Sequence, residues 1–189
     1  MLFGFSGLTV IGVVATIRSW KGHRVLIEAL KHLPVSHYRL LFVGDGPIRM
    51  AIEEELRLAG LAELVYFAGH QNNILPWLRS MDIFVLPSYA NEGISQALVQ
   101  AMMVGIPVVT TTAGAITEVA RDLQTALVVE PKDPEALRAA ITSLLDNPRL
   151  GRDLACAARE FVLLRHSEAV MVDKMDMVFR GLLPIAGKG

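Results

Sequence analysis

Cysteine is nearly absent from this chain of 189 residues, where Cys156 is the only one. A single cysteine excludes an internal disulfide framework and a zinc site built from several cysteines. Cys156 lies in an apolar helical stretch, so we interpret it as a small buried hydrophobic side chain. Because chains without disulfides are typical of reducing compartments, we expect a cytoplasmic protein.

An excess of charge of one sign is also missing, because 18 Lys and Arg residues stand against 19 Asp and Glu residues. Modules that bind nucleic acid normally carry a basic face, so we expect no nucleic-acid partner. With 52% apolar and 20% charged residues, the composition is that of a globular chain. The length suffices for one ordinary domain with a buried core.

Several catalytic signatures are absent. The five histidines are scattered, without an HExxH pattern or an acidic cluster beside them. A GxSxG sequence and a Walker phosphate-binding loop are lacking too. These absences argue against the common hydrolases and phosphotransferases, and we predict no metal site.

Charged residues are missing from the first 17 positions, which raises the question of a signal peptide or membrane anchor. The segment lacks a basic start and a small-residue cleavage site, and it is short for a membrane span. We therefore expect a buried strand over Thr9–Ala15, with residues 1–8 as a disordered lead or the boundary of an expressed piece. A peripheral membrane contact through Leu2, Phe3 and Phe5 is the alternative for this lead.

The chain does contain a regular alternation of apolar strands and amphipathic helices. Strands are expected over residues 9–15, 38–43, 64–67, 83–86, 107–110 and 126–129. Helices are expected over residues 23–32, 48–59, 73–80, 95–104, 115–120, 134–145, 149–162 and 167–182. This alternation predicts an α/β fold with a parallel sheet of about six strands, covered by helices on both faces. We expect one domain over residues 9–182, followed by a tail over residues 183–189.

The most informative stretch covers residues 82–105. An apolar strand, Ile83–Leu86, leads into a polar loop with Glu92 and Gly93, and a helix begins near Ser95. A carboxylate at a strand end beside a helix start is how an open α/β sheet builds a ligand site. Free N–H groups at the helix start favour an anion, and the carboxylate accepts hydrogen bonds from hydroxyl groups. Together they indicate a ligand with a phosphate and a polyol, such as a sugar nucleotide.

Gln100 follows Glu92 by eight residues and would face the same cleft from inside the helix. The alternative interpretation of this stretch is structural. Ser95 would then only cap the helix, Glu92 would be a solvated loop acid, and Gln100 would be a polar residue on an exposed face.

Basic residues occupy the loop after the first strand. Arg18 and Lys21 lie at the carboxyl edge of the sheet, where a guanidinium fork and an ammonium group are both suited to a diphosphate. Two solvated basic side chains on a loop are the alternative.

A glycine-rich turn, Gly44–Arg49, follows the second strand, as a dinucleotide-binding fingerprint would. However, Arg49 replaces its third glycine, Asp45 would repel a pyrophosphate, and Pro47 removes a backbone donor. We therefore interpret the turn as a structural entry into the next helix. Glu118, near a later helix start, is interpreted as an acid that favours the helix dipole.

The loop after the third strand contains polar residues that follow Gly69. Its backbone groups are suited to the edge of a nucleotide base, and the alternative is a plain turn. His70 is interpreted as a surface residue of this loop rather than a catalytic one.

Five blocks occur along the chain in one order: VVATIRSWKGH, LLFVGDGP, VYFAGH, MDIFVLPSYANEGISQALVQAMMVGIPVVTTTAGAITEV and ALVVEPKDPEALRAAI. In this order they resemble the C-terminal, nucleotide-binding half of a retaining GT-B glycosyltransferase of family 4, the glycosyl transferases group 1. The resemblance covers about residues 9 to 180, nearly the whole chain. It implies a Rossmann-like, three-layer α/β/α sandwich that binds a sugar nucleotide.

The resemblance implies a role for each matching residue of the donor site. The residues expected to be catalytic are a basic pair on the donor diphosphate and an acid on the sugar hydroxyls: Arg18, Lys21 and Glu92. Backbone N–H groups in the loop that follows would meet the phosphates and the sugar: Gly93, Ile94 and Ser95.

The base-binding segment of the family matches residues 67–73, with Gly69, His70 and Asn73 among its expected contacts. Gln100 occupies the place of the second acid in a Glu-x7-Glu motif, which normally holds the ribose hydroxyls. Glutamine accepts a hydrogen bond without charge assistance, so ribose binding should be weaker by about 1 kcal/mol.

The resemblance also implies that half of the enzyme is missing. GT-B enzymes place their chemistry between two domains, and the N-terminal, acceptor-binding domain is not in this chain. We therefore expect a fragment that binds the donor but is inactive alone. The last helix, Ser167–Leu182, would cross to that domain, so its apolar face should be unusually exposed. That face consists of Val170, Met171, Met175, Val178 and Phe179.

The implied reaction is retaining transfer of a hexosyl group from a nucleotide-diphosphate sugar, carried on UDP or GDP, to an acceptor hydroxyl. No cofactor or metal is expected. The family suggests synthesis of an envelope polysaccharide or glycolipid by a cytoplasmic enzyme, with peripheral association at the inner face of the membrane. A sugar-nucleotide epimerase and a non-catalytic partner domain are the alternatives.

Overall fold

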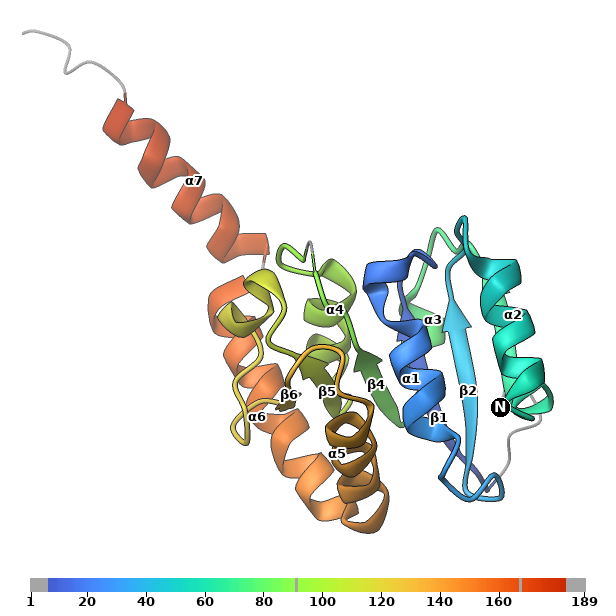
Figure 1. Cartoon of the computed structure of the whole chain (residues 1–189). Coiled ribbons are helices and arrows are strands. Elements are labelled where there is room, and N and C mark those ends of the chain that lie inside the picture. Colours follow the sequence, from blue (N-terminus) through green and yellow to red (C-terminus); the bar gives the residue numbers. More distant parts are fainter. Residues whose placement is uncertain (1–6, 91, 167, 183–189) are drawn as a thin grey trace, which may run out of the picture.

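The computed structural model describes residues 7–90, 92–166 and 168–182 of the chain (Figure 1). Residues 1–6 of the lead interpreted above over residues 1–8, and the whole of the tail over residues 183–189, lie outside this described part. Within it, the chain alternates between strands and helices, as the sequence predicts.

A six-stranded parallel sheet forms the centre of the molecule, in the order β3-β2-β1-β4-β5-β6. Its strands are β1 (Thr9–Val14), β2 (Tyr38–Val43), β3 (Val65–Gly69), β4 (Ile83–Leu86), β5 (Val108–Thr111) and β6 (Leu127–Val129). Every residue of β4 is buried, because the sheet is covered on both faces, and this is why the strand reads as an uninterrupted apolar run. The strand order turns back between β1 and β4, and at such a switch point an open α/β sheet binds its ligand.

Helices cover both faces of the sheet (Figure 1). One layer packs on side chains such as Ile11 and Leu40, and the other packs on the intervening positions, such as Val10 and Leu41. The first layer consists of α1 (His23–Leu30), α2 (Arg49–Leu58) and α5 (Pro134–Asp146). The second consists of α3 (Leu75–Leu78), α4 (Gln96–Val104) and α6 (Pro148–His166). The predicted α/β fold and its three layers are confirmed.

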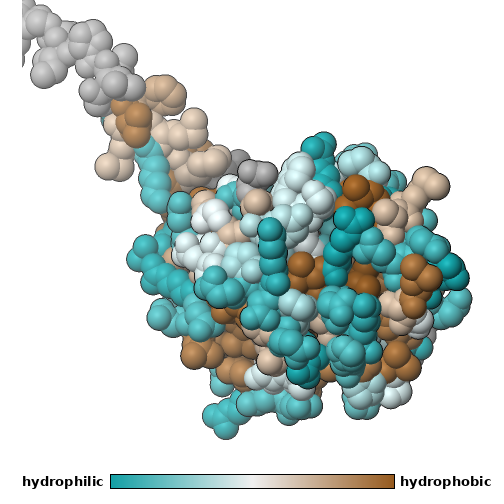
Figure 2. Space-filling model, in the orientation of Figure 1, coloured by the Kyte–Doolittle hydropathy of each residue, from teal (hydrophilic) through white to brown (hydrophobic). Residues whose placement is uncertain are grey.

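A final helix, α7 (Glu168–Leu182), projects from the body beyond the end of α6 (Figure 1). Four side chains of its predicted apolar face are between 49% and 61% exposed: Met171, Met175, Val178 and Phe179. Figure 2 shows this apolar surface standing off the body of the molecule. The predicted exposure is confirmed for these four residues. Within the described residues, no helix is long and apolar enough to cross a bilayer.

Two predictions about residues in helical segments are wrong, those for Cys156 and Glu118, whereas the short helix expected near residues 115–120 is present. Cys156 is exposed rather than buried, because the buried stripe of α6 passes through Leu154, Ala155 and Ala158 and leaves position 156 turned outward. The helix expected over residues 115–120 is a 3₁₀ helix, η3 (Gly114–Glu118). Glu118 closes η3 instead of lying in its first turn, so it has no part in stabilising a helix start.

Candidate functional site at the carboxyl edge of the sheet

A cavity of about 330 Å³ lies at the switch point, where the carboxyl ends of β1, β2 and β3 face the start of α4. Four residues predicted for the site line it together: Lys21, His70, Ser95 and Gln100. Gln96 and Ala97, in the first turn of α4, line it as well. The structure therefore brings loops from four parts of the sequence to one hollow.

Backbone contacts lock these loops to one another. Gly22 has a φ of 75°, and a Cβ at this position would lie 1.8 Å from the carbonyl oxygen of Pro87. The N–H of Tyr89 donates to the carbonyl of Trp20 over 2.9 Å. Only glycine allows the loop after β1 to approach the loop after β4 so closely, which holds the two loops in a fixed relation.

Lys21 and Glu92 form an ion pair across these two loops. The Lys21 Nζ lies 2.5 Å from the Glu92 Oε1, and the Ser88 hydroxyl donates to the same oxygen over 2.6 Å. The Glu92 side chain is only 5% exposed. Glu92 is therefore not a solvated loop acid, and that alternative interpretation of the sequence is wrong.

The start of α4 faces the cavity, and the N–H groups of Gln96 and Ala97 there have no hydrogen-bond partner among the described residues. Ser95 is its N-cap, and the Ser95 Oγ accepts a hydrogen bond from the N–H of Leu98 over 3.4 Å. The remaining N–H groups of the first turn carry the positive end of the helix dipole. Gln100 is exposed one turn further on and lines the same cavity as Lys21, whereas Glu92, whose cleft Gln100 was predicted to share, does not line this cavity.

The loop after β3 contributes only part of what the sequence predicts. His70 and its neighbour Gln71 line the cavity. Gly69 does not line it, but its carbonyl accepts a hydrogen bond from the N–H of Gly44 over 2.8 Å, which joins the loop after β3 to the turn after β2. Asn73 does not line the cavity. Its Oδ1 instead accepts from the N–H of Leu75 over 3.1 Å, at the start of α3.

The turn after β2 has the structural role predicted for it. The Asp45 carboxylate accepts from the N–H of Gly46 over 2.7 Å and from Arg49 over 3.1 Å. These two bonds hold the pKa of Asp45 below its usual value, the backbone bond contributing most. The guanidinium of Arg49 lies 5.1 Å from the ring centre of Phe67, and the carbonyl of Asp45 accepts from the N–H of Ile17 over 2.9 Å.

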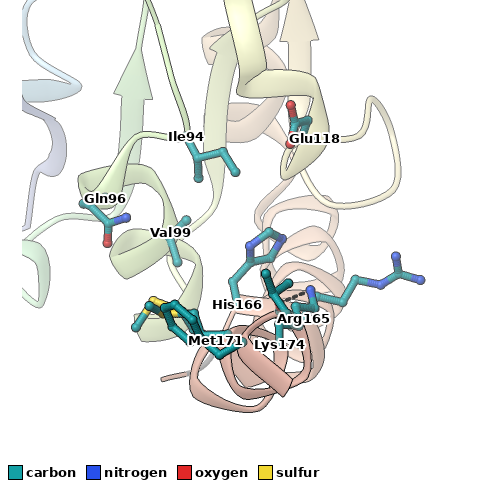
Figure 3. Close-up of a pocket in the computed structure, with 11 residues that line it drawn as sticks. Ile94, Gln96, Val99, Glu118, Arg165, His166, Met171 and Lys174 are labelled. Atoms are coloured by element: carbon teal, nitrogen blue, oxygen red, sulfur yellow. Dashed lines mark hydrogen bonds between the residues drawn. The ribbon is translucent and has the colours of Figure 1, made fainter. Parts of the chain in front are cut away.

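Three other predicted residues lie outside this cavity. Arg18 is exposed, with its guanidinium 5.2 Å from the ring centre of Trp20. Gly93 is an exposed loop residue. The side chain of Ile94 faces a different cavity, of about 690 Å³, between the α4 start and α7 (Figure 3).

That second cavity combines an apolar wall from α7 with a polar end. Glu118 lies across from His166 and Arg165 at the polar end (Figure 3). Partial burial, with Lys174 and Arg165 nearby, lowers the pKa of His166, and the negative charge of Glu118 opposes that change. Gln96 lines both cavities, so the start of α4 separates them.

His23 is a feature that the sequence analysis missed. It is the first residue of α1 and is 1% exposed. Its ring packs edge-to-face with that of Phe42, and the two ring centres are 5.2 Å apart. The Nδ1 atom is buried without a hydrogen-bond partner. Burial, with a smaller contribution from Lys21, lowers the pKa of His23 to about 4, so the imidazole is neutral at pH 7. The only sequence signal for this burial was the position of His23 beside the apolar residues of α1.

A metal site is not evident at this edge. Among residues 7–90, 92–166 and 168–182, no three His, Cys, Asp or Glu side chains gather as metal ligands would. The polar groups that line the switch-point cavity are the Lys21 ammonium, carboxamides, the His70 imidazole and the Asp45 carboxylate. The ammonium, the carboxamides and the N–H groups at the start of α4 suit phosphate and hydroxyl groups, whereas the Asp45 carboxylate suits hydroxyl groups alone.

Comparison with known families gives a match over most of the chain. The model of the family described as glycosyl transferases group 1 matches residues 8–147. The chain belongs to this family. The resemblance noted in the sequence is therefore confirmed, and the cavity lies where the loops of a group 1 glycosyl transferase domain meet.

Two curated relatives of this group 1 domain are named for lipopolysaccharide core biosynthesis. The lipopolysaccharide core biosynthesis glycosyltransferase LpsD of Rhizobium meliloti is 32% identical over 163 residues, which is 86% of this chain and 47% of LpsD. The mannosyltransferase LpsB of the same organism is 33% identical over 85% of this chain and 49% of its own. The chain spans about half the length of the curated relatives it matches.

Solved structures share the fold of this group 1 domain. HepE from Anabaena, solved in complex with UDP, has a TM-score of 0.89 at 22% identity, over 94% of this chain and 50% of its own. The C-terminal domain of a group 1 glycosyl transferase, LpcC of Francisella tularensis, has a TM-score of 0.75 at 26% identity. Here the match covers 85% of this chain and 87% of the other, so the described fold corresponds to a C-terminal domain.

Proposed function

We propose that this chain is the donor-binding half of a glycosyltransferase, which moves a sugar from a nucleoside diphosphate to an acceptor hydroxyl. The observation that carries the proposal is the Lys21–Glu92 ion pair beside the switch-point cavity and the start of α4. One cation, one carboxylate and a helix N-terminus in one place match the phosphates and hydroxyls of a sugar nucleotide.

The diphosphate would lie against the positive groups of the cavity. The Lys21 ammonium and the N–H groups of Gln96 and Ala97 are already in place, and Arg18 supplies a second cation on the same loop. In the transfer step the bond between the anomeric carbon and the diphosphate oxygen breaks, and the leaving group gains negative charge. Fixed donors and cations at that oxygen lower the barrier without having to reorganise.

Glu92 would hold the hydroxyl groups of the donor sugar. Both of its hydrogen bonds, from Lys21 and Ser88, end on Oε1, and its Oε2 makes none with the described residues. A free carboxylate oxygen in a nearly buried side chain is a strong acceptor for a sugar hydroxyl. The loop N–H groups of Gly93, Ile94 and Ser95 would complete this part of the site.

The nucleoside would extend from the diphosphate across the cavity. Gln100 would accept from a ribose hydroxyl, and the loop with Gly69 and His70 would meet the base, which we expect to belong to UDP or GDP. Asn73, whose Oδ1 accepts from the N–H of Leu75, would contribute through the loop rather than through this oxygen.

The finer assignments rest on the family and on α7. We infer retention of configuration at the anomeric carbon, an acceptor from envelope polysaccharide or glycolipid synthesis, and a cytoplasmic enzyme at the inner face of the membrane. The names of the relatives support the acceptor class. The exposed apolar face of α7 supports an N-terminal acceptor domain as the partner that covers it.

A non-catalytic partner domain is the second candidate, and Gln100 is the observation that favours it. A carboxamide in the ribose position lacks the charge that strengthens a hydrogen bond to a hydroxyl. A domain of this second kind would keep the fold and the cavity without binding nucleotide sugars.

Calorimetric titration of the purified chain with UDP, GDP and ADP, and with their glucose conjugates, separates the two candidates. We expect saturable binding of one nucleotide, weakened about tenfold by Arg18→Ala, since a cation on phosphate contributes about 1.4 kcal/mol. Glu92→Gln should weaken only the sugar conjugate. Arg152→Ala on the exposed face of α6 is the matched control for lost charge. A folded chain that binds none of these nucleotides would contradict donor binding.

A further inference from the structure

A second group of cations and aromatic rings lies at the same edge of the sheet, outside the switch-point cavity. Lys132, in the loop between β6 and α5, places its Nζ 4.7 Å from the ring centre of Tyr89. Tyr89 precedes Glu92 by three residues in the loop after β4. Its backbone donates to Trp20, whose ring lies under the guanidinium of Arg18. Neither Tyr89 nor Lys132 lines the cavity assigned to the donor.

The backbone of Lys132 is strained. Its φ is 63°, and Leu123 is the only other residue of the described part that has a positive φ without being glycine. An L-residue with a side chain pays for this conformation through crowding of its Cβ, and glycine would not. Strained residues of this kind cluster at functional sites, so the strain at Lys132 suggests a function for its ammonium group.

None of the described residues forms an ion pair that would neutralise the charge of Lys132. The neighbouring acids are engaged elsewhere: the Asp133 carboxylate caps α5 through the N–H of Ala136 at 2.9 Å, and Glu130 accepts from the Thr112 hydroxyl at 3.4 Å. Contact with the half-buried Tyr89 ring restricts the flexible lysine, so less conformational entropy is lost when the ammonium meets an anion.

We propose that Tyr89 and Lys132 form a subsite for an anionic group, a phosphate or carboxylate, on the sugar that accepts the transferred residue. The proposal rests on the proposed function, which places the donor diphosphate in the switch-point cavity and the donor sugar at Glu92. An acceptor must approach that sugar from outside the cavity. The loop that carries Glu92 also carries Tyr89, so the subsite lies next to the reacting end of the donor rather than at its base.

Titration of the chain with glucose 6-phosphate, followed by NMR with UDP present at saturation, tests this subsite. We expect saturable shifts of the Tyr89 and Lys132 signals while UDP stays bound. Lys132→Gln and Tyr89→Leu should each weaken this binding about fivefold, as expected for one preorganised cation, and leave UDP affinity unchanged. Lys31→Gln, on the far end of α1, is the matched control. Glucose should bind less well than its phosphate.

The outcomes separate this inference from the function on which it rests. If UDP, GDP and ADP all fail to bind, donor binding is contradicted; if GDP or ADP binds in place of UDP, that nucleotide takes the place of UDP in this titration. If UDP binds but glucose 6-phosphate moves no signals at Tyr89, or is displaced by UDP, the acceptor subsite is contradicted. Displacement would mean that the anion belongs to the donor cavity instead.

Lys132→Gly provides a second readout, because it removes the ammonium and the strain together. We expect its midpoint of thermal unfolding to stay level or rise while binding of glucose 6-phosphate falls. A fall of more than about 3 °C would show that the lysine serves the stability of the fold, and would overturn the functional account of the strain.

Discussion

At the scale of single residues, the site is defined by contacts between loops. Glu92 is nearly buried because Lys21 and Ser88 satisfy one of its oxygens, so the carboxylate is fixed before any ligand arrives. Fixed charges of this kind lose little entropy on binding, which favours a specific ligand. Gln100 and His23 each lead to a prediction at this scale, because Gln100 replaces the acid of the family motif and His23 is a buried imidazole.

Gln100→Glu should tighten the binding of ribonucleotides to the chain. A carboxylate accepts from ribose hydroxyls with charge assistance, which is worth about 1 kcal/mol, or about fivefold in Kd. Calorimetry with UDP and with 2′-deoxy-UDP measures the effect, and the gain should be smaller for the deoxynucleotide. Equal gains for both would mean that residue 100 does not contact the ribose.

His23 should make the fold sensitive to mild acid. Its pKa is about 4 in the folded chain, against 6.5 for a free imidazole, because the ring is buried. Between these pH values the unfolded state binds more protons, so the free energy of unfolding falls as pH drops from 6.5 towards 4. At pH 4.5 the loss from this residue is about 2 kcal/mol relative to pH 7.

Urea unfolding at pH 7 and pH 4.5 measures this loss, and His23→Phe should remove most of it. The variant His32→Phe, at an exposed position after α1, is the control for the loss of a histidine. If His23→Phe and wild type lose the same stability between the two pH values, the acid sensitivity originates elsewhere.

At the scale of elements, the sequence predicts strands better than it predicts which way helical residues point. Buried parallel strands are apolar on both faces, so β1, β2 and β4 could be located from composition alone. The phase of a helix depends on its neighbours, and this is why the exposure of Cys156 was missed. The expected helix over residues 73–80 is reduced to Leu75–Leu78 because Asn73 forms a local turn before it.

In the site, too, the sequence indicates which residue types are present but not which of them contact one another. Residue types in the loops and at the helix start placed Lys21, Ser95 and Gln100 in one expected donor site, and in the structure all three line one cavity. The ion pair of Lys21 with Glu92, and the burial of His23, depend on contacts between loops more than 60 positions apart or between layers. Such contacts leave no periodic signal in the sequence.

Phe179→Glu should leave the stability of the domain nearly unchanged, because α7 stands away from the body and Phe179 is 59% exposed. We expect a change in the free energy of unfolding of less than about 0.5 kcal/mol, together with weaker self-association in analytical ultracentrifugation. Met50→Glu, on the exposed face of α2, is the control. A loss of 2 kcal/mol or more would mean that the α7 face packs against the body in solution.

At the scale of the whole molecule, the chain corresponds to about half of the relatives it matches. Its carboxyl edge contains groups suited to the donor. The apolar wall of the larger cavity, formed by α7, is of the kind that a partner domain covers.

The isolated chain should therefore bind a nucleotide sugar without transferring it. Release of free nucleotide from the bound conjugate, followed by chromatography over hours, should proceed no faster than in buffer. A rate of transfer to added glycan near the usual 1–10³ per second of enzymes would show that this half carries the complete chemistry.

The strand order has a consequence for how the molecule assembles. β1, β2 and β3 follow one another in the sequence, as do β4, β5 and β6, so each half-sheet closes through short connections. Within the sheet, the two halves meet along β1 and β4, and beside this seam the backbone N–H of Val10 donates to the Asp82 carboxylate 72 positions away. Closing such a long loop costs more entropy than closing the short ones, so this seam should gain protection from hydrogen exchange last during refolding. Because the switch-point cavity opens on that seam, the two half-sheets can acquire their structure while the chain is still unable to hold a ligand, and nucleotide binding then reports the final step of folding.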